Sequence, residues 1–206
     1  MDDCYWVGRG QSALNSRIMD TRRQSRYNPS MFSAKPLPGL PAYGPPALSF
    51  PEANAFREGY VVEFTSEHGE SWVGNFACFD GFGISSVHSE LGANAIAVVA
   101  GGQGYLVDAE SKALVRELGV DIKHIWFDER TRAMIIGNGL WFESFSANKI
   151  FWQSRRLSWD GVRILGMNES TVTGEAFDPI APEDSWLPFC LDLATGEVNG
   201  GSYTGP

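Results

Sequence analysis

The sequence has no long apolar run and no block that resembles an export signal. Its longest apolar stretch, "AIAVVA" at 95–100, is far shorter than the roughly 18–20 apolar residues that cross a bilayer. The N-terminus carries Asp2 and Asp3 and lacks the apolar core of about 7–15 residues that secretory signals contain. We therefore expect no membrane partner and a cytoplasmic location.

Cysteine is scarce, and its spacing argues against the common cysteine-based sites. The three cysteines, an odd number, include no CxxC pair, so neither a disulfide framework nor a zinc site is expected. Cys78 in "FACFDGFG" and Cys190 in "PFCLD" lie among large apolar residues. Since burial raises the pKa of a thiol and makes it unreactive, we predict buried free thiols rather than nucleophiles.

The sequence also lacks a strong catalytic or cofactor motif. The glycine-rich "AGGQGY" at 100–105 leads into "YLVD", which has the pattern of a strand, whereas a phosphate loop leads into a helix. His88 and His124 stand thirty-six residues apart with no carboxylate or thiol at a ligand-like spacing. We therefore expect no metal, no cofactor and no catalysis.

Positive charge is scarce outside the N-terminal segment. The chain has 16 Lys and Arg against 25 Asp and Glu, a net charge of −9. Residues 1–35 hold six basic and three acidic residues, whereas residues 36–206 hold ten basic and twenty-two acidic residues. Such an acidic body repels phosphate backbones and attracts basic surfaces. We expect a basic protein partner and no nucleic acid.

Proline divides the chain into two parts. Seven of the eleven prolines fall between Pro29 and Pro51, and proline excludes both helix interiors and central strands. We therefore predict an irregular N-terminal arm at 1–55 and a β-repeat domain at 56–206. The arm could dock "LPGLP" in an aromatic groove of a partner, or it could cover a sheet edge. We favour the second role.

The second part contains an internal repeat. Residues 95–115 align with 131–151 without a gap, and "VRILGMNE" at 162–169 aligns with "IKHIWFDE" at 122–129. A fragment of a further copy lies at 60–76. Each copy alternates apolar strands with glycine-rich or polar turns, so we predict about three repeats, each a four-stranded meander.

Repeats of this length are typical of propeller blades. The turns in "YLVDAESKALV" and "CLDLATGEVNG" resemble those of propellers whose strands carry an Asp followed by a Thr-Gly turn. The resemblance covers roughly residues 84–201 and implies an all-β fold. The repeats would form either a partial or small β-propeller or a twisted two-layer β sandwich.

An insert interrupts the last repeat at "DPIAPEDS", residues 178–185. Inserts in repeat proteins emerge as loops on one face and often bind partners. The alternative is a solvated loop that protects an edge strand from aggregation. The candidate partner-binding residues of the insert, its surroundings and the preceding repeat are Glu175, Asp178, Glu183, Asp184, Trp186, Asp128 and Glu129.

Together these features predict a non-catalytic protein-binding module. In general character, as a small, acidic chain without an export signal, the sequence is similar to immunity proteins of bacterial polymorphic toxins. That resemblance implies a toxin as the basic partner. The alternative is a glycan-binding or glycoside-hydrolysing enzyme with a pocket lined by acids and tryptophans. The sequence leaves the choice between monomer and homodimer open.

Overall fold

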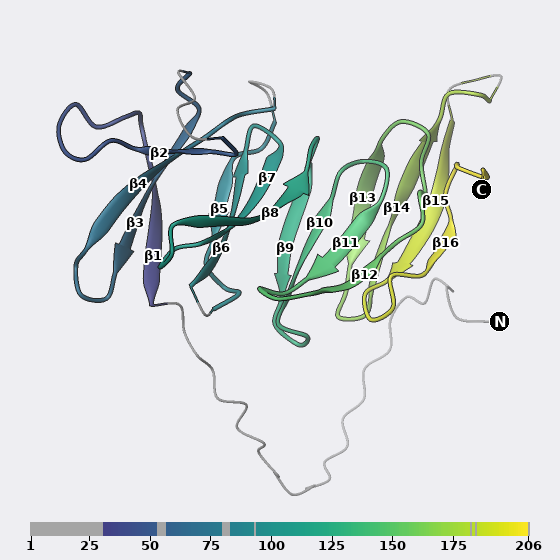
Figure 1. The fold of residues 1–206 in the computed structure, drawn as a ribbon. Coiled ribbons are helices and arrows are strands. Elements are labelled where there is room, and N and C mark those ends of the chain that lie inside the picture. The colour runs from purple at the N-terminus through teal and green to yellow at the C-terminus, as the bar shows by residue number, and fades with distance from the viewer. Residues whose placement is uncertain are drawn as a thin grey trace, which may run out of the picture.

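The computed structural model describes residues 31–52, 57–79, 83–92, 94–181, 183 and 185–205. These residues form sixteen β-strands in four four-stranded sheets, which confirms the predicted all-β fold (Figure 1). Within the described ranges no helix has the length and apolarity needed to cross a membrane.

Three of the sheets are antiparallel meanders in which each strand pairs with the next along the chain. Sheet 2 contains β5 (Ser86–His88), β6 (Ala95–Ala100), β7 (Gln103–Asp108) and β8 (Ala113–Gly119). Sheet 3 contains β9 (His124–Asp128), β10 (Ala133–Gly137), β11 (Phe142–Phe145) and β12 (Ile150–Gln153). Sheet 4 contains β13 (Val162–Met167), β14 (Thr171–Asp178), β15 (Ser185–Asp192) and β16 (Val198–Gly200). These three sheets correspond to the predicted repeats.

Sheet 1 is built differently, with the order β1-β3-β4-β2. It contains β1 (Phe32–Leu37), β2 (Leu48–Phe50), β3 (Tyr60–Ser66) and β4 (Ser71–Phe76). The hairpin β3–β4 is the fragment of a further repeat, and the proline-rich segment supplies the strand at each edge, β1 antiparallel to β3 and β2 parallel to β4. Residues on both sides of position 55 thus build one sheet. Pro36 lies in an edge strand, where its missing N–H leaves no gap in the ladder.

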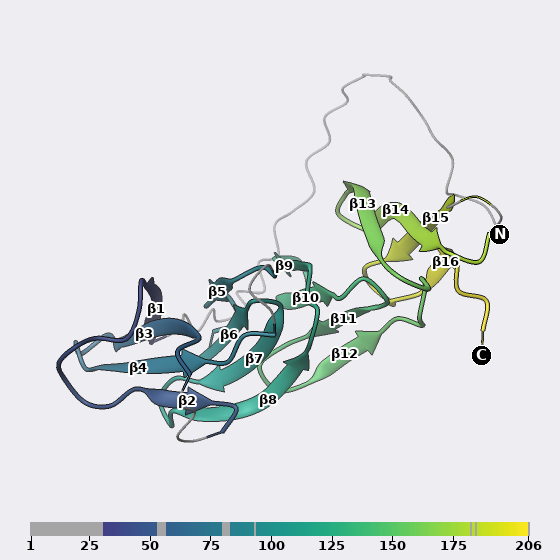
Figure 2. The same ribbon diagram turned by 90° about the horizontal axis from the view of Figure 1, so that it is seen from above.

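The four sheets pack face to face in chain order and form an open, curved stack (Figure 2). One hydrophobic cluster lies between each pair of neighbouring sheets, and sheets 1 and 4 stand at opposite ends. The expected choice between a propeller and a two-layer sandwich is thereby resolved in favour of propeller-like stacking without closure. Strands β1, β5, β9 and β13 lie along one long side of the stack, here called the inner side.

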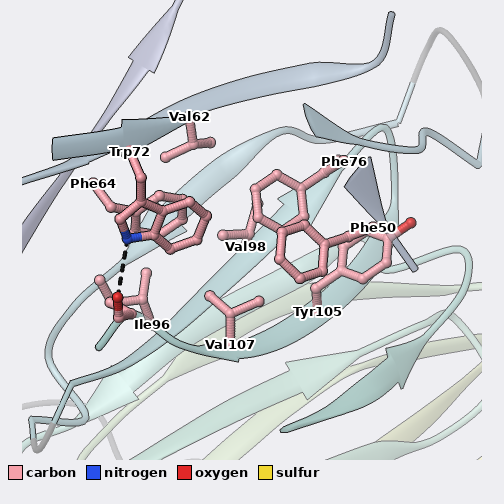
Figure 3. Packing of buried hydrophobic residues seen from close by; sticks show 11 residues of the cluster. Phe50, Val62, Phe64, Trp72, Phe76, Ile96, Val98, Tyr105 and Val107 are labelled. Carbon is pink, nitrogen blue, oxygen red and sulfur yellow. Dashed lines mark hydrogen bonds between the residues drawn. The ribbon is translucent and has the colours of Figure 1, made fainter. Parts of the chain in front are cut away.

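The joint between sheets 1 and 2 is mainly aromatic (Figure 3). The rings of Phe64 and Trp72 stack at 4.1 Å, and Trp72 Nε1 donates a hydrogen bond of 2.9 Å to the carbonyl of Ala109 in sheet 2. The Tyr105 hydroxyl donates to the Ala77 carbonyl at 2.8 Å. The indole N–H and the phenol O–H of these buried rings therefore both donate hydrogen bonds across the joint, as polar groups in a stable core must.

Five hairpin turns are closed by an Asp or Asn side chain. The five residues stand at the end of a strand or directly after it, and each accepts hydrogen bonds from the backbone N–H groups of the second and third residues that follow: Asp108, Asp128, Asn138, Asn168 and Asp192. Such Asx turns reverse the chain without help from other elements. The Asp-containing turns noticed in the sequence are thus part of the fold.

Candidate binding groove

The structure separates the predicted partner-binding residues into two groups at opposite ends of the sheets. Asp178 pairs with Ser185 where β14 and β15 meet the insert. Asp128 and Glu129 belong to the turn after β9, beside the turn that begins at Asn168. Strand β14 spans about 23 Å between these ends, at roughly 3.3 Å per residue. The two groups therefore cannot contact one compact ligand.

Most of the groups near the insert already have partners. Glu175 accepts a hydrogen bond of 2.6 Å from Arg163 Nε, and the Arg163 guanidinium lies 4.3 Å from the ring centre of Trp186. Asp178 Oδ1 accepts a hydrogen bond of 3.0 Å from the backbone N–H of Ile180. Glu183 is exposed, and Asp184 lies outside the described residues. On the outer face of sheet 4, Arg163 therefore neutralises the charge of Glu175 and packs against the ring of Trp186.

The other group borders a cavity of about 590 Å³ between sheets 3 and 4. Its apolar lining includes Trp126 of β9, Met167 of β13 and Leu193 in the turn after β15. The full lining is Trp126, Phe127, Asp128, Glu129, Arg130, Met167, Asn168, Glu169 and Leu193. The cavity therefore combines an indole and a thioether with several charged groups.

The charged groups of this cavity differ in how far they are already paired. Asp128 accepts hydrogen bonds from the Arg130 N–H at 2.9 Å and the Thr131 hydroxyl at 2.7 Å, and it lies 3.5 Å from the Arg130 guanidinium. Glu129 and Glu169 are exposed, and neither makes a hydrogen bond or ion pair with the described residues. Two carboxylates beside apolar side chains suit a cation that carries an apolar stem.

A second cavity of about 440 Å³ continues along β9 and shares Trp126 and Met167 with the first. It is lined by Ile84, Ser86, His88, Lys123, His124, Ile125, Trp126, Ile164 and Met167. We call the two cavities together the β9 groove, since both follow this strand. Lys123 lies 3.1 Å from Asp121, so its charge is paired.

The two histidines of the groove are shifted toward their neutral forms. Burial lowers the pKa of His124, with a smaller opposing effect of the Val162 carbonyl, and His124 Nε2 is buried without a hydrogen-bond partner in the described structure. Burial also lowers the pKa of His88, and nearby Glu90 opposes this shift. His88 Nε2 lies 2.9 Å from the Ser86 hydroxyl. These imidazoles are partly buried polar groups between neighbouring sheets.

The described residues contain no group of three or more His, Cys, Asp or Glu side chains arranged to hold a metal ion. The prediction of buried thiols was wrong for Cys78, which is exposed because it follows the end of β4, and Cys190 is only half-buried on sheet 4. Compared with known proteins, the chain matches no protein-family model and no curated protein.

The sequence reasoning missed Trp126, Met167 and Glu169, although a signal for one of them was present. The alignment of 122–129 with 162–169 places Glu169 on Glu129. Equivalent turns of stacked repeats lie side by side, so this alignment already implies that the two glutamates meet on neighbouring sheets. No comparable signal in the sequence distinguishes the Trp126 indole from a core side chain.

Proposed function

We propose that this protein is a non-catalytic binding protein whose β9 groove receives a basic side chain of a partner protein. The observation that carries the proposal is the pair of unpartnered carboxylates, Glu129 and Glu169, beside Trp126 and Met167 in one cavity. A Lys or Arg side chain offers both an apolar stem and a terminal cation, so it matches this combination.

The energetics favour this class of ligand. A cation near an indole gains about 0.5–2 kcal/mol, depending on how far it is desolvated. Unpaired carboxylates at the rim add attraction, and the excess of acidic over basic residues in 36–206 steers a basic surface toward the protein. The insert near Asp178 is less suited, because its neighbour Glu175 is already paired with Arg163.

The test is a charge reversal of the groove, Glu129→Lys with Glu169→Lys. Affinity capture from the native host's lysate should yield a basic protein with the wild-type chain, and the groove variant should lose it. The partner should then be purified, and its Kd for both forms measured by calorimetry. We expect the groove variant to bind at least 30-fold more weakly.

The matched control is Asp160→Lys with Glu183→Lys, which makes the same change of net charge with exposed residues outside the cavity lining. It should weaken binding less than threefold once long-range attraction is screened with 0.15 M salt. If both variants lost the same amount of binding affinity, the interaction would depend only on net charge, and the groove would not be the binding site. A folded wild-type chain that captures no basic protein would also contradict the proposal.

A toxin is the specific partner that the resemblance to immunity proteins suggests, and we extend the proposal to it. Neutralisation requires that one molecule of this protein abolish the activity of one molecule of the captured enzyme, and that the groove variant fail to do so. We propose the cytoplasm as the compartment, since the exposed free thiol of Cys78 suits a reducing environment.

A glycan is the second candidate ligand, because Trp126 lines a cavity that also contains carboxylates. Sugar rings pack on indoles and hydrogen-bond to carboxylates, so this composition fits them as well. Titration with neutral oligosaccharides, followed by tryptophan fluorescence, separates the candidates. The glycan would be favoured if three results coincide. Trp126→Ala abolishes the fluorescence response to the oligosaccharide, Glu129→Lys with Glu169→Lys alters it, and no basic protein partner is captured.

A further inference from the structure

The inner side of the stack leaves strand edges unpaired, and one of them runs along the proposed site. Strand β9 pairs only with β10, so its second edge has no ladder partner among the described strands. This edge borders the β9 groove, because the groove is lined from Lys123 to Arg130. A free strand edge beside a groove is the arrangement by which many domains bind an extended peptide as an additional strand.

We propose that the β9 groove takes its partner as an extended segment added to the free edge of β9. This inference rests on the proposed function and specifies the form of the ligand. The five residues of β9 give room for about five residues of added strand, at roughly 3.3 Å each. Backbone hydrogen bonds to β9 would supply affinity, and alternate side chains would supply specificity.

The orientation of the β9 side chains sets the pattern of the ligand. Trp126 packs in the cluster between sheets 3 and 4, whereas Ile125 and Phe127 pack in the cluster between sheets 2 and 3. Residues of an added strand alternate in the same way. The side chain opposite Trp126 therefore faces the apolar part of the cavity, and the side chain two positions along faces Glu129 and Glu169.

The recognised feature is thus a basic residue separated by one residue from an apolar residue. The order depends on whether the added strand is parallel or antiparallel to β9. The neighbouring strand β13 would support the apolar side chain, because Met167 is 59% exposed and lines both cavities. Lys and Arg both satisfy the basic position.

The free edge of β13 is a weaker template than that of β9. Its register shifts between Ile164 and Gly166, and Leu165 at this irregularity is 66% exposed. Bulges of this kind interrupt the row of N–H and C=O groups that an added strand needs. The ladder of β9 with β10 runs without a shift from His124 to Asp128, so its second edge is regular.

Labelled pentapeptides test the inference on the full-length protein by fluorescence anisotropy. The probes are Ser-Lys-Ser-Leu-Ser and Ser-Leu-Ser-Lys-Ser, and the matched control of the same composition is Ser-Ser-Lys-Leu-Ser, in which the two key residues are adjacent. One of the two spaced peptides should bind at least fivefold more tightly than the control. The variant Glu129→Gln with Glu169→Gln should reduce that binding at least fivefold.

Backbone methylation of the preferred peptide tests the added strand itself. Alternate N–H groups of a strand point to the same neighbour, so N-methylation should weaken binding at least tenfold at one set of alternate positions and less than twofold at the other. This readout needs no change in the protein, so misfolding of a variant cannot mimic it.

Peptide binding without spacing preference or alternation would overturn the added strand and leave the proposed function standing. The added strand is equally overturned if no pentapeptide binds while a basic partner protein is still lost by Glu129→Lys with Glu169→Lys. If the charge reversal affects neither peptides nor partner, both proposals are wrong.

Discussion

The joint that holds the groove together depends strongly on Phe142, so we predict that Phe142→Ala destabilises this joint selectively. Phe142 is fully buried between sheets 3 and 4, with ring centres 6.2 Å from Phe189 and 6.1 Å from Trp126. Its ring also occupies the space over Gly137, where a Cβ atom would come within 2.4 Å of it. Truncation therefore removes a large buried surface and leaves a cavity.

Truncation of a buried Phe costs about 3–5 kcal/mol of unfolding free energy. The matched control is Phe151→Ala on β12, since Phe151 is 43% exposed and its loss should cost less than about 1 kcal/mol. Urea unfolding at pH 7.5 measures both values. A domain with total stability of about 5–15 kcal/mol survives the first loss only marginally, so the measurement should be made at low temperature.

The same variant shows whether the sheets unfold separately. Because each sheet contacts only its neighbours, damage between sheets 3 and 4 should spread little to sheets 1 and 2. Amide hydrogen exchange of Phe142→Ala should rise in β9–β16 and remain unchanged in β3–β7. A uniform rise through all four sheets, or a loss below about 1.5 kcal/mol, would refute this account of the joint.

Three further predictions concern stability. Burial lowers the pKa of His124 below its unfolded value of 6.5, so the stability that this group contributes is present above pH 6.5 and is lost as the pH falls below it. His124→Gln should therefore narrow the difference between the urea midpoints measured at pH 7.5 and pH 5.5. An unchanged difference would contradict this account. Arg116 Nη2 lies 2.6 Å from the buried carboxylate of Glu143, so Arg116→Ala should lower the unfolding free energy by about 1–3 kcal/mol in urea. The same substitution in a Glu143→Gln background should lower it clearly less. Trp72→Phe removes the indole N–H that donates a hydrogen bond from sheet 1 to sheet 2, so it should lower the unfolding free energy by about 1–3 kcal/mol and raise amide exchange around Ala109. No change in either measurement would show that this hydrogen bond does not contribute to stability.

The repeats could be predicted because their signals are local. Alternation of apolar residues and the turn residues after Asp108 and Asp192 depend on a few neighbouring positions, and the structure uses both as expected. The strands β1 and β2 were not foreseen as strands, because proline normally argues against a sheet. Pro36 is compatible with β1 only because that strand lies at an edge, which is a property of the whole sheet.

The candidate site could be predicted only in part for the same reason. The sequence favours the insert as a binding site because four carboxylates lie near it. In the structure, however, its neighbour Glu175 on β14 pairs with Arg163 on the adjacent strand β13, and sequence spacing does not reveal this pair. The charge of Asp128 predicts a contact with a partner, whereas in the structure Asp128 mainly accepts hydrogen bonds from its own turn. Charge alone therefore overestimates how many acids are free to bind.

The turns at one end of three neighbouring sheets each carry a glutamate, and these side chains should differ in their effect on binding. Glu90, Glu129 and Glu169 follow β5, β9 and β13, and the turns of sheets 2 and 3 are joined by Arg132, which donates to the Glu90 carbonyl at 3.4 Å. Glu90 lies 3.7 Å from His88 and is absent from the lining of both cavities.

We therefore expect Glu129→Gln and Glu169→Gln each to weaken binding of the basic partner or peptide at least threefold at pH 7.5. Glu90→Gln should change it less than twofold, although it removes the same charge from the same row of turns. Calorimetry of the three single variants measures this ranking. If Glu90→Gln matched the other two, the ligand would be recognising the acidic edge as a whole, and the cavity beside Trp126 would not be its binding site.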